Sequence, residues 1–150
     1  MVRQLPTRPV VELTGDVVRL LVDGMNVIGS RPDGWWRDRD GAARRLFERL
    51  RHLAAESDDE LTLVLDGRPL DDLPEGTHHG VEVLYARRPG RNAGDDRIVE
   101  ALSAAPDATA VCVVMSDRDL TRRARALGAE TAGARSLLGR LDRLPDDGPA

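Results

Sequence analysis

Acidic side chains follow several of the apolar runs in this sequence. Asp23 comes directly after VVRLLV, Asp66 after LTLVL, and Asp117 after AVCVVM and one serine. The pair Asp95-Asp96 opens a segment whose apolar residues have helical spacing. If the runs are parallel strands, these carboxylates lie beyond the carboxyl ends of one sheet, where open α/β sheets bind their ligands. The pattern predicts one acidic cleft built from four separate segments.

Such a cleft favours a divalent cation. Two carboxylates about 4 Å apart repel by roughly 4 kcal/mol at an effective dielectric of 20, so a cluster must protonate, spread apart or bind metal. Oxygen ligands without His or Cys select Mg²⁺ or Mn²⁺ over Zn²⁺. Such an ion can polarise a phosphoryl oxygen and activate water. Each aspartate taken alone is more often a turn or helix-cap residue, so the hypothesis depends on their convergence.

The elements that must position these acids alternate between strand and helix. Apolar runs predict strands at 17–22, 61–65, 81–85 and 110–115, with a short fifth strand at 129–131. Helical spacing predicts helices from Asp40 as N-cap, from about Asp95 to Ala104, from about Asp119 to Leu127 before Gly128, and at Arg135–Leu141. Residues 24–39 and 67–80 are predicted loops. The alternation indicates a three-layer α/β fold, with a central, mostly parallel sheet of four to five strands and helices on both faces.

Length and composition set the boundaries of this domain. A chain of 150 residues fits one domain. We expect a flexible arm at residues 1–15, the folded domain at 16–142 and a disordered tail at 143–150. The single cysteine, Cys112, lies in an apolar run and is expected to be a buried thiol, which suits a reducing, cytoplasmic location. No run of residues has the length of a membrane span.

Charge and residue usage exclude some chemistry. The net charge of −4 is unusual for a nucleic-acid partner, although a metal would neutralise the acidic site. All 22 basic residues are arginines. Without lysine, the chain has neither a Walker A loop nor the lysine of a phosphoacceptor receiver domain.

Three motifs make the sequence recognisable. LLVDGMNVIG at residues 20–29 resembles the opening motif of NYN-domain proteins, a branch of the PIN-like nuclease superfamily. The strand at 81–85 followed by NAGDDRIVEAL resembles that family's extended strand and paired-Asp helix, and VVMSDRDL resembles its next strand. Their order and spacing are most similar to YacP-like NYN endoribonucleases, over residues 17–141. Two positions depart from the family pattern: Gly94 stands where a threonine is usual, and Leu65-Asp66-Gly67 where Phe-Asp-Ala or Phe-Asp-Gly is usual.

The resemblance implies a PIN-like fold and metal-dependent cleavage of RNA, in which metal-activated water leaves 5′-phosphate and 3′-hydroxyl ends. By matching positions, it implies that the main metal carboxylates are Asp23, Asp96 and Asp117. It gives Asp95 a role as a ligand or as the partner of one. It implies that Asn26 orients the water or binds the substrate phosphate.

The same resemblance assigns supporting residues. Asp66 matches the acidic residue after the family's second strand. Ser116 would support the site through its hydroxyl. Asp119 would either support the metal site or cap the following helix, and we favour the cap slightly.

Arginines and tryptophans suggest where RNA binds. A basic loop adjoins the paired aspartates, and we expect it to contribute to an RNA-binding surface through Arg87, Arg88, Arg91 and Arg97. A solvated loop in an arginine-rich protein is an equal alternative. Arg118 would contact the scissile phosphate or form a salt bridge. Trp35 and Trp36 would stack on unpaired bases or cover the first predicted helix.

Two other functions compete with the nuclease. The chain would alternatively be a weakly active or inactive RNA-binding or ribosome-binding module, and the ribosome enters only through the family branch. Other metal phosphotransferases fit poorly. Toprim nucleases need a glutamate where Asp23 stands, and haloacid-dehalogenase-type phosphatases need an aspartate where Met25 stands.

Overall fold

The protein, described here from a computed structural model at residues 19–90 and 92–145, forms one six-stranded sheet with the order β3-β4-β2-β1-β5-β6. Its strands are β1 (Arg19–Asp23), β2 (Glu60–Leu65), β3 (Gly76–His78), β4 (Val81–Tyr85), β5 (Val111–Val114) and β6 (Glu130–Ala132). Every neighbouring pair is parallel except β3 with β4. The predicted α/β class is confirmed, with one strand more than expected.

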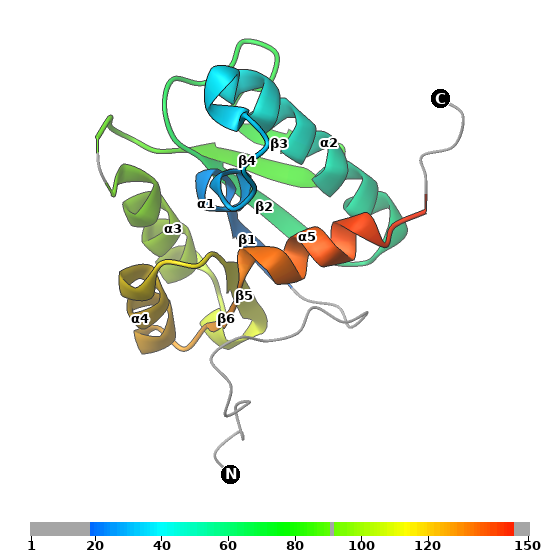
Figure 1. Ribbon diagram of the computed structural model, residues 1–150. Coiled ribbons are helices and arrows are strands. Elements are labelled where there is room, and N and C mark those ends of the chain that lie inside the picture. Colours follow the sequence, from blue (N-terminus) through cyan, green and yellow to red (C-terminus); the bar gives the residue numbers. More distant parts are fainter. Residues whose placement is uncertain (1–18, 91, 146–150) are drawn as a thin grey trace.

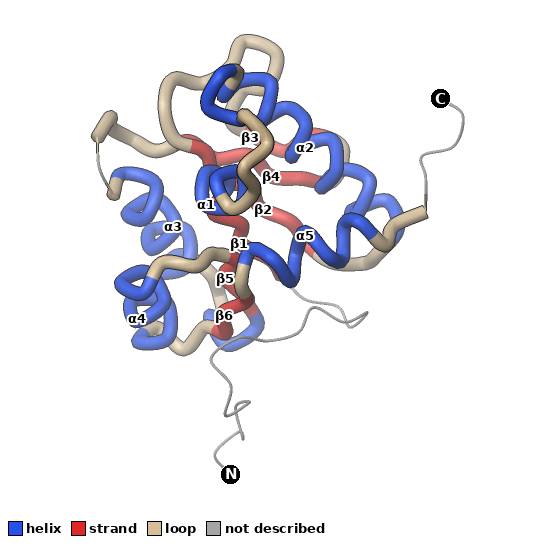
Figure 2. Tube along the Cα trace, viewed as in Figure 1, coloured by secondary structure: helices blue, strands red, loops and turns tan. Residues whose placement is uncertain are grey.

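Helices cover both faces of the sheet. The α-helices are α1 (Gly24–Gly29), α2 (Arg39–Glu56), α3 (Ala93–Ala104), α4 (Arg118–Ala126) and α5 (Ala134–Asp142), and the 3₁₀ helices are η1 (Trp35–Arg37) and η2 (Ala108–Ala110). Figure 1 shows α1, α2 and α5 on one side of the strands and α3 and α4 on the other. Figure 2 shows the strands as the middle layer between these two groups.

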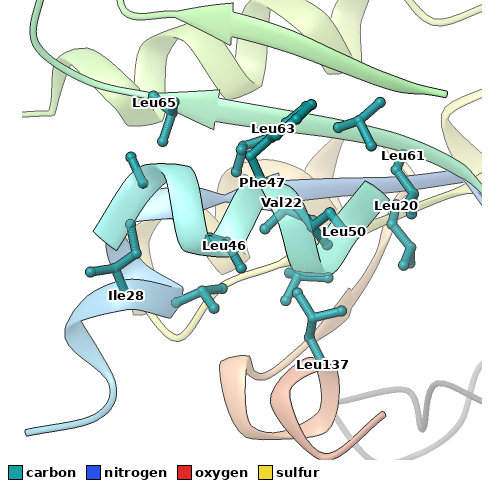
Figure 3. Packing of buried hydrophobic residues seen from close by; sticks show 14 of the residues in the cluster. Leu20, Val22, Ile28, Leu46, Phe47, Leu50, Leu61, Leu63, Leu65 and Leu137 are labelled. Carbon is teal, nitrogen blue, oxygen red and sulfur yellow. The ribbon is translucent and has the colours of Figure 1, made fainter. Parts of the chain in front are cut away.

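Two hydrophobic cores result from the alternation of side chains along each strand. Leu20 and Val22 of β1 belong to the core beneath α1, α2 and α5, whereas Leu21 belongs to the core beneath α3 and α4. Figure 3 shows the first core, where Phe47 and Leu50 of α2 pack among strand residues. Because both faces of β1 and β5 are buried, these strands are continuous apolar runs.

The predicted loop at 24–39 is wrong in part, because it contains α1 and η1. Helix α1 forms because Asp23 caps it and because Val27 and Ile28 bury their side chains in the core. The predicted cap of the next helix is also corrected. Asp38, not Asp40, accepts the Gly41 N–H at 2.9 Å.

The predicted loop at 67–80 contains β3, which forms an antiparallel pair with β4. The other predicted strands and helices lie within a few residues of their expected positions, and Gly128 ends α4 with a positive φ of 96°. The predicted arm at 1–15, residues 16–18 and tail residues 146–150 lie outside the described residues. No described helix combines the length and the apolarity that a membrane crossing requires.

Candidate active site

The acidic residues after β1, β2 and β5 meet at one edge of the sheet. The register pairs Asp23 with Val64 and Val22 with Val114, so Asp66 and Asp117 follow two and three residues beyond these partners. Because the three strands are parallel and adjacent, their carboxyl ends place all three aspartates on the same side. The expected convergence of these strand ends is confirmed.

These residues line a cavity of about 270 Å³. Four carboxylates contribute to its walls, from Asp23, Asp66, Asp95 and Asp117. The remaining walls come from Met25, Asn26, Val64, Gly90, Asn92 and Gly94. We call this space the acidic cavity.

Asp23 is the most perturbed carboxyl group of the cavity. Its side chain accepts the Asn26 N–H at 3.4 Å and so begins α1. Burial, together with the smaller effect of the nearby charges of Asp95, Asp66 and Asp117, raises the pKa of Asp23 to about 7 against the opposing effect of the Asn26 backbone hydrogen bond. In the cation-free protein, Asp23 therefore titrates near neutral pH.

Asn26 also lines this cavity, and its side-chain oxygen is not satisfied by the protein. Its Oδ1 is buried and has no hydrogen-bond partner among the described residues. The start of α1 positions it closely, because a Cβ on Gly24 would lie 2.8 Å from the Val64 carbonyl oxygen. Only glycine therefore lets α1 begin against β2 at this point. A buried, unpartnered amide oxygen beside carboxylates suits a cation ligand.

Asp95 and Asp96 are neighbours in the chain but have different contacts. Asp95 lines the acidic cavity, and burial followed by the charge of Asp117 raises its pKa. Asp96 does not line the cavity. Its carboxylate binds Arg123 of α4, at 3.1 Å, and Arg88, and these two hydrogen bonds lower its pKa.

The sequence resemblance implies that Asp96 is a main metal carboxylate and that Asp95 is a ligand or the partner of one, whereas the structure places Asp95, and not Asp96, in the wall of the acidic cavity. Helical phase offered a signal for this difference. Asp95 precedes the buried Ile98 and Leu102 by three and seven residues, so it shares their face of α3.

Asp117 has a structural role as well as a place in the cavity. Its carboxylate accepts the Leu120 N–H at 2.8 Å and caps α4. The preference for Asp119 as the cap is therefore wrong. Asp119 is exposed and pairs with Arg122 at 3.1 Å, and it does not line the acidic cavity.

Asp66 lies where the acidic cavity meets a neighbouring groove. It lines both, and its Oδ1 is 3.4 Å from Nη2 of Arg39 at the start of α2. The ion pair offsets one negative charge of the cluster. Arg39 was not predicted as a site residue, because it lies in a segment expected to be loop and far in sequence from the acids.

The donors of the cavity fit a hard divalent cation, since all are carboxylate or amide oxygens. They surround the space rather than crowd around one point. Within residues 19–90 and 92–145, no three His, Cys, Asp or Glu side chains are close enough together to hold a metal ion. Binding would therefore draw the carboxylates inward.

The arginines of the predicted RNA surface have separate roles. Arg87 binds Glu100 through Nε at 2.7 Å and through a second nitrogen, and Arg88 binds Asp96. Arg97 corrects the prediction. It is 7% exposed, and its guanidinium donates to the Tyr85 carbonyl and to Glu100, so it is a structural residue. Arg91 lies outside the described residues.

Ser116 and Arg118 lie beside a different cavity. This space of about 460 Å³ adjoins α4 and β6, and neither residue lines the acidic cavity. The Ser116 hydroxyl accepts the Ala134 N–H at 3.5 Å, which ties β5 to the start of α5. The expected support of the metal site by this hydroxyl is not seen. Arg118 forms no ion pair with any described carboxylate, so of its two possible roles the salt bridge is not seen.

The two tryptophans differ in their surroundings: Trp35 packs against the core, whereas Trp36 is exposed. Trp35 packs against the core and lies near Gly29, so it covers the protein interior. Trp36 is 54% exposed, and the guanidinium of Arg37 lies 5.8 Å from the centre of its ring.

Asn92 is a further residue of the acidic cavity that the sequence analysis did not predict. Its φ of 65° places it in a left-handed conformation before α3.

Comparisons with known proteins agree with this architecture. The model of the YacP-like NYN domain matches residues 20–148. Crystal structures of Rae1 (YacP) from Bacillus subtilis are similar to this chain. One of them has a TM-score of 0.67 with 27% identity, over 84% of this chain and 74% of that one. The W164L mutant has a TM-score of 0.69 with 25% identity, over 85% and 77%.

No protein of curated function matches the sequence. The family match nevertheless covers almost all the described residues and includes every element that lines the acidic cavity. The chain belongs to the family of YacP-like NYN domains.

Proposed function

We propose that this protein is a metal-dependent endoribonuclease that hydrolyses single-stranded RNA with Mg²⁺ or Mn²⁺. One observation carries the proposal: four aspartates and Asn26, whose buried oxygen has no partner among the described residues, line one cavity at the carboxyl edge of the sheet. Membership of an NYN family supports a nuclease that acts on RNA. Association with the ribosome stays a prediction.

Three aspartates and Asn26 would hold the cation. Asp23 ends β1, Asp95 lies in the first turn of α3 and Asp117 caps α4, so a strand end and two helix starts position the three carboxylates. Asn26 would contribute its free Oδ1 or orient the attacking water. A bound divalent cation supplies polarisation of the phosphoryl oxygen and acidification of water. Asp66, paired with Arg39, is a further donor at the mouth.

Protonation of Asp23 couples cation binding to pH. With its pKa at about 7, Asp23 holds a proton over much of the neutral range when no cation is present. It must release that proton to act as a ligand, so cation affinity is expected to fall as pH drops below 7. Cleavage at limiting Mg²⁺ should fall in the same range.

Exchange of the two adjacent aspartates tests the site. Asp95→Asn should reduce cleavage of a single-stranded oligoribonucleotide about 100-fold or more, since it removes a cavity carboxylate. Asp96→Asn should reduce it less than about 10-fold, because Asp96 pairs with Arg123 and Arg88 outside the cavity. Asp71→Asn removes an exposed carboxylate elsewhere and serves as the control. Full activity in Asp95→Asn would contradict the assignment.

A second readout is independent of catalysis. MgCl₂ or MnCl₂ at about 100 times its Kd should stabilise the wild-type protein by roughly 2.7 kcal/mol. The rise in melting temperature should be lost in Asp95→Asn and kept in Asp71→Asn. A rise of equal size in all three proteins would show that the cation binds elsewhere.

RNA binding without cleavage is the second candidate function. It is favoured by the spread of the carboxylates, since no three acidic groups in the described part of the chain are at ligand distance from one point. Tight binding of single-stranded RNA with no turnover under Mg²⁺ or Mn²⁺ would establish this function instead.

A further inference from the structure

A groove of about 360 Å³ adjoins the acidic cavity. The groove and the cavity share three wall residues, Met25, Asp66 and Gly90. An RNA strand whose scissile phosphate lies at the acids can therefore place its neighbouring nucleotide in this groove.

The walls of the groove have an apolar part and a charged part, in which three arginines outnumber the two aspartates Asp40 and Asp66. Met25 and Leu70 are half-buried and face the space above the buried side chains of Leu65 and Tyr85. A flat nucleobase suits such a surface, since a thioether packs well against aromatic rings. Arg39, Arg68 and Arg88 contribute the positive charges of this part. Guanidinium groups suit phosphate, which they bind through two parallel hydrogen bonds.

Arg68 is the arginine of the groove with no carboxylate partner in the described part of the chain. Arg39 pairs with Asp66, and Arg88 pairs with Asp96. Arg68 is exposed and lines the groove. Its charge is therefore available to an anion that enters from solvent.

Two glycines leave the groove accessible. Gly67 has a φ of 81° and Gly90 a φ of 111°, so both positions disfavour residues with a side chain. An added Cβ at Gly67 would meet no atom within 4 Å, which shows that no packing contact requires the glycine. The bare backbone lets a ligand approach closely.

We propose that this groove binds one nucleotide of the single-stranded RNA, directly beside the scissile phosphate. The base lies against Met25 and Leu70, and Arg68 binds the phosphate at the rim. The volume is near the lower end of small-ligand sites and suits one nucleotide. The groove would thereby give the enzyme a base preference at one position next to the cut. This inference rests on the proposed function.

The larger cavity beside α4 is a less suitable place for this nucleotide. It is lined by Arg118 and Arg122, but it shares no wall residue with the acidic cavity. It therefore gives a clear alternative outcome for a binding experiment.

Methionine methyl groups report on the two locations separately. The chain has three methionines, and Met25 lines the groove whereas Met115 lines the cavity beside α4. The four ribonucleoside 5′-monophosphates, titrated into methyl-¹³C-methionine protein with EDTA present, should shift the Met25 signal. A shift of Met115 instead, or of neither methyl, would overturn the proposal.

Matched arginine variants test the phosphate contact. Arg68→Ala should weaken the nucleotide-dependent shift of Met25 about 5- to 10-fold in Kd, as loss of a charge-assisted hydrogen bond implies. Arg51→Ala removes the same charge from an exposed site on α2 that lines none of these spaces, and it should bind as wild type does. Equal weakening in both variants would show an unspecific effect of charge and would contradict the proposal.

Cleavage kinetics separate this inference from the function on which it rests. With RNA substrates that differ at one base beside the cut, Met25→Ala should reduce the difference in kcat/KM between bases, and Arg68→Ala should raise KM more than it lowers kcat. If RNA is cleaved and Arg68→Ala matches wild type in KM, the groove is not the subsite. If no RNA is cleaved but Met25 still shifts with nucleotide, the groove is supported and the nuclease function fails.

Discussion

Asp23 combines two roles that make opposite demands on its charge. As the N-cap of α1 it is favoured in the ionised form, but its burial and the nearby charges of three other aspartates favour the protonated form. Desolvation prevails, and its pKa rises from the ordinary 3.8 to about 7. A cation in the acidic cavity would remove the conflict.

The stability of the cation-free protein should therefore depend on Asp23. The pKa of Asp23 is higher in the folded state than in the unfolded state. Its stabilising contribution to the free energy of unfolding is therefore fully present below about pH 4 and is lost as pH rises through 7. Asp23→Asn keeps a capping side chain without the charge. We expect the variant to unfold at a higher temperature than wild type at pH 8, and at a similar temperature at pH 4.

Thermal melts of both proteins in EDTA from pH 4 to pH 8 measure this difference. Other carboxylates, such as Asp72 and Asp142, also change the stability with pH because their ion pairs lower their pKa. Comparing the two proteins at the same pH cancels these shared effects. A constant difference between wild type and variant over this range would show that Asp23 titrates normally.

Asp117 contributes both to the acidic cavity and to the start of α4. Its carboxylate faces the acidic cavity and also accepts the Leu120 N–H, so α4 begins at a candidate metal ligand. A single substitution can remove the charge, the cap or both.

Two substitutions at Asp117 separate these effects. Asp117→Ala should lower the free energy of unfolding by about 1 kcal/mol, the usual cost of losing a cap. Asp117→Asn should have little effect on stability, because asparagine caps equally well. Both should abolish cleavage. Denaturant melts and a cleavage assay measure the two properties, and a stable, inactive Asp117→Asn is the informative result.

Elements with a strong apolar pattern could be predicted from the sequence, and the others could not. Strands β1, β2 and β5 were found because both of their faces are buried. Helix α1 was missed because Gly24, Asn26 and Gly29 weaken its helical propensity, and its stability comes from a cap and from core contacts distant in sequence. Strand β3 has no apolar alternation and forms only as the partner of β4.

The site was predictable as a set of strand ends but not in its detail. The positions of Asp23, Asp66 and Asp117 follow from strand order alone. The choice of Asp95 over Asp96 depends on the phase of α3, and the partners of Asp96 come from α4 and from the loop after β4. Arg97 was misassigned, because nothing in its neighbourhood shows that Glu75, 22 residues earlier, would pair with it.

Across the whole molecule, Arg97 connects segments that are far apart in the chain. Its guanidinium donates to the Tyr85 carbonyl at the end of β4, to Glu100 within α3 at 2.8 Å, and to Glu75 before β3 at 3.4 Å. It thereby fixes the antiparallel edge of the sheet to the helix that carries Asp95.

Removal of this connection should destabilise the fold. Arg97→Met removes the guanidinium donor of the buried Tyr85 carbonyl and should lower the free energy of unfolding by about 2 kcal/mol, or the melting temperature by roughly 6 °C. Arg122→Met, at an exposed arginine of α4, should change stability by less than about 0.5 kcal/mol. Calorimetry of both variants checks the contrast, and an equally small change in both would place Arg97 on the surface in solution.

The position of Cys112 makes its alkylation rate a measure of how often the centre of the sheet opens. This thiol is 0% exposed in β5, which hydrogen-bonds to β1 on one side and β6 on the other, and burial raises its pKa to about 12. A maleimide can react with it only when β5 separates from its neighbours, so the rate of alkylation counts those openings. As the sole cysteine of the chain, it reports without interference from a second thiol. Because Asp117 follows β5 closely in the chain, any ligand that bridges the walls of the acidic cavity should slow the alkylation of Cys112.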